Sequence, residues 1–153
     1  MRVRVPLALF GATTLLVAAC SSAGAPTPAA PASAAPGSAG GSNAITAELS
    51  EWAIKLDSGT GTAGTVTITI QNKGEKTHEF VVVKTDTAAD KLPVVDDEVP
   101  EAQAGEKVDE KEDIKSGTTE TLVLKDLKPG HYVFLCNLTG HYAKGMHADF
   151  DVK

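Results

Sequence analysis

Three residues near the carboxyl end of the sequence, Cys136, His141 and Met146, carry side chains that bind metal ions. A thiolate, an imidazole and a thioether on one short segment are ligands that suit copper. A copper site for electron transfer takes two imidazoles, one thiolate and a weak axial thioether. The second imidazole must therefore come from elsewhere in the chain, and His78 is the candidate.

Each of these four residues alone is also compatible with an ordinary structural role. Cys136 ends an apolar run and could be a small core residue, and Met146 could fill a gap in the core. Their joint spacing favours a metal site, because Gly140 and Gly145 precede two of them and allow the loop to fold back on one point. His78 lies more than fifty residues earlier, so the site would join two distant segments.

The elements that must position these side chains are strands, because the globular part shows no helical stripe of useful length. Apolar alternation or β-branched runs predict strands at 45–56, 65–70, 78–84, 118–124, 132–136 and 147–152. About seven short strands with turns between them favour a two-sheet sandwich. The expected core residues are Leu49, Trp52, Ile54, Val66, Ile68, Ile70, Leu122, Leu124, Ala148, Phe150 and Val152.

The amino-terminal residues carry a targeting signal. Arg2 and Arg4 precede a short apolar stretch that ends in small residues, which is typical of a secretory signal peptide over residues 1–19. Its end resembles the bacterial lipobox, whose cysteine, here Cys20, becomes the first mature residue and receives a lipid. We therefore expect a lipid anchor on the extracytoplasmic face of the cell membrane, in the periplasm or at the cell surface. An ordinary signal peptide that contains a cysteine is the alternative.

The residues after Cys20 are almost entirely Ala, Pro, Ser and Gly and cannot bury a core. We expect a disordered linker over residues 20–43, which would span about 25–30 Å. The globular domain is then residues 44–153, enough for one core. This domain contains a single cysteine, Cys136, and an unprotected thiol outside the cell would oxidise. Metal binding would instead hold that sulfur as a buried thiolate.

The chain is acidic, and loss of Arg2 and Arg4 with the signal peptide takes its net charge from −6 to −8. Eleven acidic residues and three lysines lie in residues 86–113, where nucleic acid is an unfavourable partner. Two prolines and a glycine interrupt residues 85–113, so we expect only short strands or one helical turn there. Two interpretations stay open: a solvated loop, or a docking patch for a basic partner.

The candidate ligands lie within a longer motif. A C-x4-H-x4-M spacing follows a Y-x-F-x-C strand that Pro-Gly precedes, and Asn72, Gly74 and His78 form an N-x-G-x-x-x-H pattern. This motif resembles the cupredoxins, small blue copper proteins such as plastocyanin, azurin, auracyanin, rusticyanin and sulfocyanin. The loop lengths are most similar to those of auracyanin, rusticyanin and sulfocyanin. The resemblance covers nearly all of residues 44–153.

The resemblance implies an all-β Greek-key sandwich of about seven to eight strands with one type 1 copper ion. It implies that His78, Cys136 and His141 form a trigonal plane, and that Met146 is the axial ligand. The relatives usually have Asn after the first histidine, whereas this chain has Glu79. We expect Glu79 to pair with Asn137 in place of that residue.

The resemblance also implies an electron carrier rather than an enzyme. In the relatives the loop histidine is exposed in an apolar patch where the electron passes. Here that residue is His141, with Leu138 and Tyr142 beside it, and the alternative is that Tyr142 packs inward. A redox donor and acceptor, one of them basic, would dock near His141 or on the acidic region 86–113.

Other functions fit the sequence less well or stay open. A copper delivery or storage protein would use the same ligands without carrying electrons. Multicopper oxidases and copper nitrite reductases need further histidines, and this chain has four in all. A zinc site would not usually include Met. His131 and His147 are not expected to be ligands.

Overall fold

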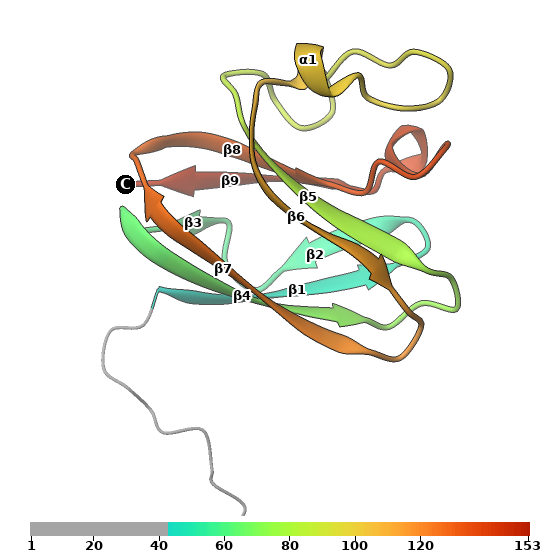
Figure 1. The fold of residues 1–153 in the computed structure, drawn as a ribbon, viewed down its shortest axis with the longest axis horizontal. Coiled ribbons are helices and arrows are strands. Elements are labelled where there is room, and N and C mark those ends of the chain that lie inside the picture. The colour runs from blue at the N-terminus through green and yellow to red at the C-terminus, as the bar shows by residue number, and fades with distance from the viewer. Residues whose placement is uncertain (1–42) are drawn as a thin grey trace, which may run out of the picture. The chain divides into compact units, whose positions relative to one another are not determined.

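The computed structural model describes residues 43–153, which form two β-sheets packed face to face (Figure 1). One sheet has the order β2-β1-β4-β7, from β1 (Ala44–Ser50), β2 (Ala53–Leu56), β4 (Gly64–Asn72) and β7 (Thr119–Leu127). The other has the order β3-β9-β8-β5-β6, from β3 (Thr60–Gly61), β5 (His78–Lys84), β6 (Glu106–Ile114), β8 (Gly130–Leu135) and β9 (His147–Val152). A helical turn, α1 (Glu101–Ala104), and a 3₁₀ turn (Tyr142–Lys144) complete the domain. The all-β sandwich is the fold that the sequence predicts.

The predicted signal peptide, Cys20 and the linker up to residue 42 lie outside the described residues. Within residues 43–153, the one α-helix and the 3₁₀ turn are both too short to cross a membrane.

The core between the sheets follows from the alternation of the strands. Val66, Ile68 and Ile70 all point inward from β4 and are fully buried, as predicted. Phe80, Phe134 and Phe150 face them from the other sheet, with neighbouring ring centroids 5.0 Å apart. The predicted core residues Trp52 and Ala148 are different, because both are only partly buried and pack against this core.

The strand β5 is apolar on both faces because both faces are covered. Phe80 and Val82 point into the sandwich, whereas Val81 and Val83 point outward into a second buried cluster. That outer cluster is completed by the acidic segment between β5 and β6, residues 85–105, which lies over this sheet (Figure 1). The segment contributes Ala89, Leu92, Val99 and Ala104. The interpretation of this stretch as a solvated loop is therefore wrong at its apolar positions.

The strand β6 is longer than the sequence predicts. Only short strands or a helical turn were expected there; the turn is α1, but β6 has nine residues and pairs with β5. Its side chains are mostly charged and exposed, so no apolar alternation shows in the sequence. Backbone pairing with β5 and the burial of Ile114 at its end place this strand.

The aromatic core leads to a prediction about stability. The change Phe150→Ala removes a ring that is fully buried and stacked on Phe134. We expect it to lower the free energy of unfolding by about 3–5 kcal/mol, because it removes buried area and leaves a cavity. Urea denaturation followed by the fluorescence of Trp52 measures this. The control Val123→Ala, at a 43% exposed position of β7, should change the value by less than about 0.5 kcal/mol. Similar losses in the two variants would contradict the assignment of this core.

Candidate metal centre

The pairing of β5 with β8 brings His78 and Cys136 to the same end of one sheet. The two strands are antiparallel, with Val81 opposite Leu135, so the start of β5 lies beside the end of β8. His78 is the first residue of β5, and Cys136 directly follows β8. Both side chains are fully buried. Residues 58 positions apart thus meet because of strand register.

The loop between β8 and β9 folds back through two glycines. Gly140 and Gly145 have φ angles of 75° and 114°, in the region that favours glycine. The N–H of Cys136 donates to the carbonyl of Met146 at 3.0 Å, and the N–H of Met146 donates to the carbonyl of His141 at 3.2 Å. Met146 is fully buried in the same core cluster as Cys136. The three loop residues predicted as ligands are therefore tied together by their own backbone.

Three donor atoms converge at this end of the domain. The Nδ1 atoms of His78 and His141 lie 3.3 Å apart. The Sγ of Cys136 lies 3.3 Å from Nδ1 of His141 and 4.0 Å from Nδ1 of His78. A point equidistant from these atoms is about 2 Å from each, which matches metal–imidazole bonds of about 2.0–2.1 Å. The residues present therefore fit a small metal ion.

Burial favours the uncharged forms of two of the donors. Burial raises the pKa of the Cys136 thiol, although the N–H of Glu79 donates to its sulfur at 3.4 Å. Burial likewise lowers the pKa of His141, and the nearby His78 lowers it further. A bound cation favours the thiolate and binds imidazole in its neutral form. With two nitrogens, one thiolate and a buried thioether nearby, this donor set suits copper.

The predicted pairing of Glu79 with Asn137 is present. The Oε1 of Glu79 accepts a hydrogen bond from the backbone N–H of Asn137 at 2.7 Å, and this contact joins β5 to the ligand loop. Burial raises the pKa of Glu79. The side chain of Asn137 in turn accepts from the N–H of Val99 at 2.7 Å and donates to its carbonyl at 2.9 Å. The acidic segment is therefore attached to the residue next to Cys136.

The sequence interpretation missed Glu51, which lies in the connection between β1 and β2. Its Oε1 lies 3.1 Å from Nε2 of His78 and also accepts from the backbone N–H of Lys76 at 2.9 Å. The Lys76 bond is the main reason that the pKa of Glu51 falls to about 2. The glycine at position 74 leaves room for this carboxylate, because a Cβ there would lie 2.6 Å from it, but no sequence pattern pointed to the contact.

The surroundings of His141 differ in part from the prediction. Its ring packs edge-on against Trp52, with centroids 4.8 Å apart, and Leu138 lies partly buried on the same loop. Tyr142 does not border His141 at the surface, because it is buried and its hydroxyl bonds the backbone of Ala89 and Leu92. The alternative, that Tyr142 packs inward, is therefore correct.

The two remaining histidines lie outside the donor cluster, as expected. The ring nitrogens of His131 lie 3.0 Å from Asp151 and 3.2 Å from Asp149. The ring of His147 packs against Tyr142, with centroids 4.9 Å apart.

Comparisons with known proteins give a family and similar folds. Residues 55–153 match the model of the sulfocyanin (SoxE) domain family. The structure of dithionite-reduced auracyanin from the photosynthetic bacterium Roseiflexus castenholzii is 27% identical, with a TM-score of 0.55, and the match covers 73% of this chain and 98% of that one. No curated protein matches the sequence.

Two further structures show similarity of fold. Auracyanin A, a blue copper protein from Chloroflexus aurantiacus, is 20% identical with a TM-score of 0.52, and the match covers 74% of this chain and 100% of that one. Rusticyanin is 19% identical with a TM-score of 0.52, and the match covers 72% of this chain and 76% of that one.

The attachment of the acidic segment to the ligand loop can be tested with Asn137→Ala. This change leaves the N–H and C=O of Val99 without their partner, and each unsatisfied group costs about 1–3 kcal/mol. We expect the backbone amide of Val99 to exchange with solvent at least tenfold faster, measured by hydrogen–deuterium exchange. The control Thr139→Ala removes an exposed hydrogen bond to Glu98 and should leave that rate nearly unchanged. Equal rates for Val99 in Asn137→Ala and wild type would contradict the attachment.

Proposed function

The chain belongs to the sulfocyanin (SoxE) domain family, and from this premise we propose that it is a membrane-tethered, extracytoplasmic carrier of single electrons. Members of the cupredoxin group to which sulfocyanins belong are copper proteins that transfer electrons between redox partners. The cofactor of this chain is accordingly one type 1 copper ion. The observation that carries the proposal is the convergence of Nδ1 of His78, Nδ1 of His141 and Sγ of Cys136.

We assign the ligands from this convergence and from the family. His78, Cys136 and His141 supply the three strong donors, and Met146 supplies a weak thioether. Bound copper supplies a one-electron couple between Cu(I) and Cu(II). The protein's part is to hold two of the donors in buried positions at the ends of strands, where little rearrangement is possible.

Electron exchange with a partner would take place at His141. Its ring is the half-buried member of the donor triangle, whereas His78 and Cys136 are fully buried. The ring packs against Trp52, and the partly buried Leu138 lies on the same loop, so the route outward from the ring is partly apolar. In this proposal the partner approaches the ligand loop rather than the middle of either sheet.

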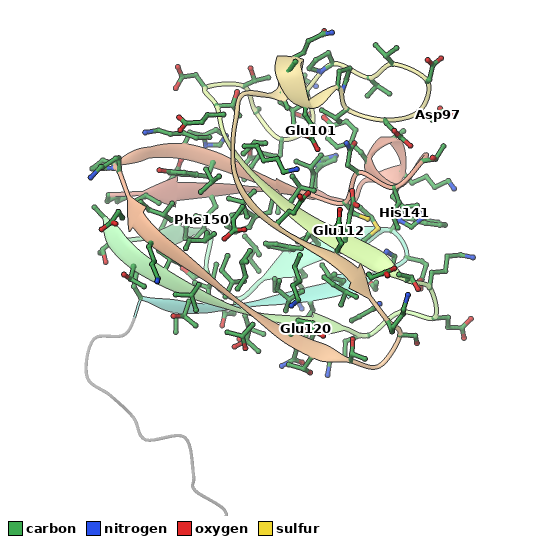
Figure 2. The ribbon with its side chains drawn as sticks, in the orientation of Figure 1. Asp97, Glu101, Glu112, Glu120, His141 and Phe150 are labelled. Carbon is green, nitrogen blue, oxygen red and sulfur yellow. The ribbon has the colours of Figure 1, made fainter. Side chains whose placement is uncertain are left out.

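Acidic residues beside the ligand loop favour a basic redox partner. Asp97 accepts the N–H of Gly140 on its carbonyl at 2.8 Å, and the carboxylate of Glu98 binds the hydroxyl of Thr139 at 2.6 Å. Figure 2 shows Asp97 and His141 at the same end of the domain. Opposite charges on a partner would speed the encounter at low ionic strength. The acidic region 86–113 would thus serve both packing and docking.

A copper delivery or storage protein is the alternative function. It would use the same four residues, and the chemistry of the donor atoms is compatible with it. An enzyme of the oxidase or nitrite reductase group is disfavoured, because the donor cluster among the described residues contains two of the chain's four histidines.

The ligand assignment predicts a colour. Cu(II) added to the purified protein should give an intense blue absorption from charge transfer between the Cys136 sulfur and copper. The change Cys136→Ser should abolish it, and visible absorption spectra measure the difference. The control His131→Gln, which removes a histidine outside the cluster, should keep the colour.

Two results would count against the carrier. A colourless Cu(II) complex, or a colour that survives Cys136→Ser, would exclude the assigned ligands. A blue protein that fails to cycle reversibly between its two oxidation states at an electrode would favour the storage function instead.

The lipid anchor is tested separately with Cys20→Ala. Without the thiol that accepts the lipid, the protein should move from the membrane fraction to the soluble fraction of the cell envelope, while the copper spectrum stays the same. Fractionation followed by immunoblotting measures the distribution. A protein that stays with the membranes after this change has no lipid anchor at Cys20.

A further inference from the structure

A carboxylate contacts the side of His78 that faces away from the donor triangle. The Oε1 of Glu51 lies 3.1 Å from Nε2 of His78, while Nδ1 of the same ring faces His141 and Cys136. The Glu51 side chain is 23% exposed and that of His78 is fully buried. Because Nδ1 must offer its lone pair to a metal, Nε2 carries the proton, and this N–H donates a hydrogen bond to Oε1 of Glu51.

The carboxylate is held by groups other than His78. Its Oε1 accepts the backbone N–H of Lys76 at 2.9 Å, and its Oε2 accepts the backbone N–H of Glu75 at 3.2 Å. Together with Nε2 of His78, three N–H donors thus converge on one side chain, and two of them come from the turn that precedes β5. Hydrogen bonds of this kind favour the ionised carboxylate, in agreement with its lowered pKa.

The turn is built to admit this carboxylate. A Cβ at Gly74 would lie 2.6 Å from Oε1 and 2.7 Å from Oε2 of Glu51, so a larger residue would displace the carboxylate. The buried Asn72 fixes the same turn: its side chain accepts the N–H of Gly74 at 3.0 Å and donates to the carbonyl of Lys76 at 2.7 Å. The N-x-G part of the motif therefore serves Glu51 as well as chain reversal.

We propose that Glu51 is a positioning residue that fixes the ring of His78 and lowers the reduction potential of the bound copper. The inference rests on the proposed function, because it requires His78 to be a copper ligand. A carboxylate that accepts the distal N–H of a metal-bound imidazole makes that imidazole more basic. A more basic ligand and a nearby negative charge both stabilise Cu(II) relative to Cu(I), because the oxidised ion carries the larger charge.

Glu79 does not supply the same effect. Its carboxylate is directed to the backbone of Asn137, and the contact with Cys136 is made by its backbone N–H. Burial raises the pKa of Glu79, whereas hydrogen bonds lower that of Glu51. Among these two, Glu51 is the one that holds a ligand by its carboxylate.

The test compares Glu51→Gln with Glu75→Gln in the full-length protein. Both variants remove one negative charge, from two segments that contact each other, but the side chain of Glu75 is exposed and only its backbone contacts Glu51. Redox titration followed by the blue absorption gives the reduction potential of each. We expect a positive shift in Glu51→Gln that is at least twice the shift in Glu75→Gln.

A second readout reports the hydrogen bond itself. In the Cu(I) protein, the proton on Nε2 of His78 should resonate far downfield in the NMR spectrum and move upfield in Glu51→Gln but not in Glu75→Gln. If Glu51→Gln does not fold, Gly74→Ala displaces the same carboxylate without changing the charge, and it should shift the potential in the same direction.

The outcomes separate this inference from the proposed function. A blue wild-type protein whose potential shifts equally in the two Gln variants, or whose His78 proton signal does not move, overturns the role of Glu51 alone. A wild-type protein that forms no blue copper complex overturns the proposed function and this inference together.

Discussion

The antiparallel register between β5 and β8 is the constraint on which the site depends. It places His78 and Cys136 at one end of a sheet, and both are buried there by the core that stabilises the sandwich. A shift of one residue in either strand would turn every side chain of that strand to the opposite face. The apolar residues of β5 prevent such a shift, because Phe80 and Val82 fit the inner core while Val81 and Val83 fit the outer one.

The ligand loop is held from outside as well as from inside. On the inner side, Met146 lies in the sandwich core. On the outer side, the hydroxyl of Tyr142 accepts the N–H of Leu92 at 3.0 Å and donates to the carbonyl of Ala89 at 2.6 Å. The acidic segment therefore acts as a cover for the loop, and the carboxylate of Glu98 comes to lie against Thr139 of the loop as a consequence. Packing and surface charge are properties of the same stretch of chain.

The sequence predicts the sandwich from strand alternation. It also predicts the donor residues His78, Cys136 and His141 from their side-chain types and spacing. Val66, Ile68 and Ile70 alternate strictly, and Gly140 and Gly145 adopt the positive φ angles that the loop requires. The sequence does not predict β6, whose charged side chains hide its pairing with β5.

The sequence does not predict the contacts of Glu51 and Tyr142 either. A glutamate near a tryptophan has no local pattern that points to a histidine 27 residues later. Such contacts depend on which loops meet, and only the assembled fold determines that.

The way in which the three donors are held favours a carrier over a store. His78 is fixed through Nε2 by Glu51, the sulfur of Cys136 receives the N–H of Glu79, and the backbone N–H of His141 donates to Leu138 at 2.8 Å. Each donor is thus oriented by protein contacts that do not involve the metal. Donors held in this way would rearrange little between the two oxidation states of a bound copper ion, which would lower the reorganisation that accompanies electron transfer. A delivery protein needs the opposite property, because at least one ligand must move away before the metal can be released.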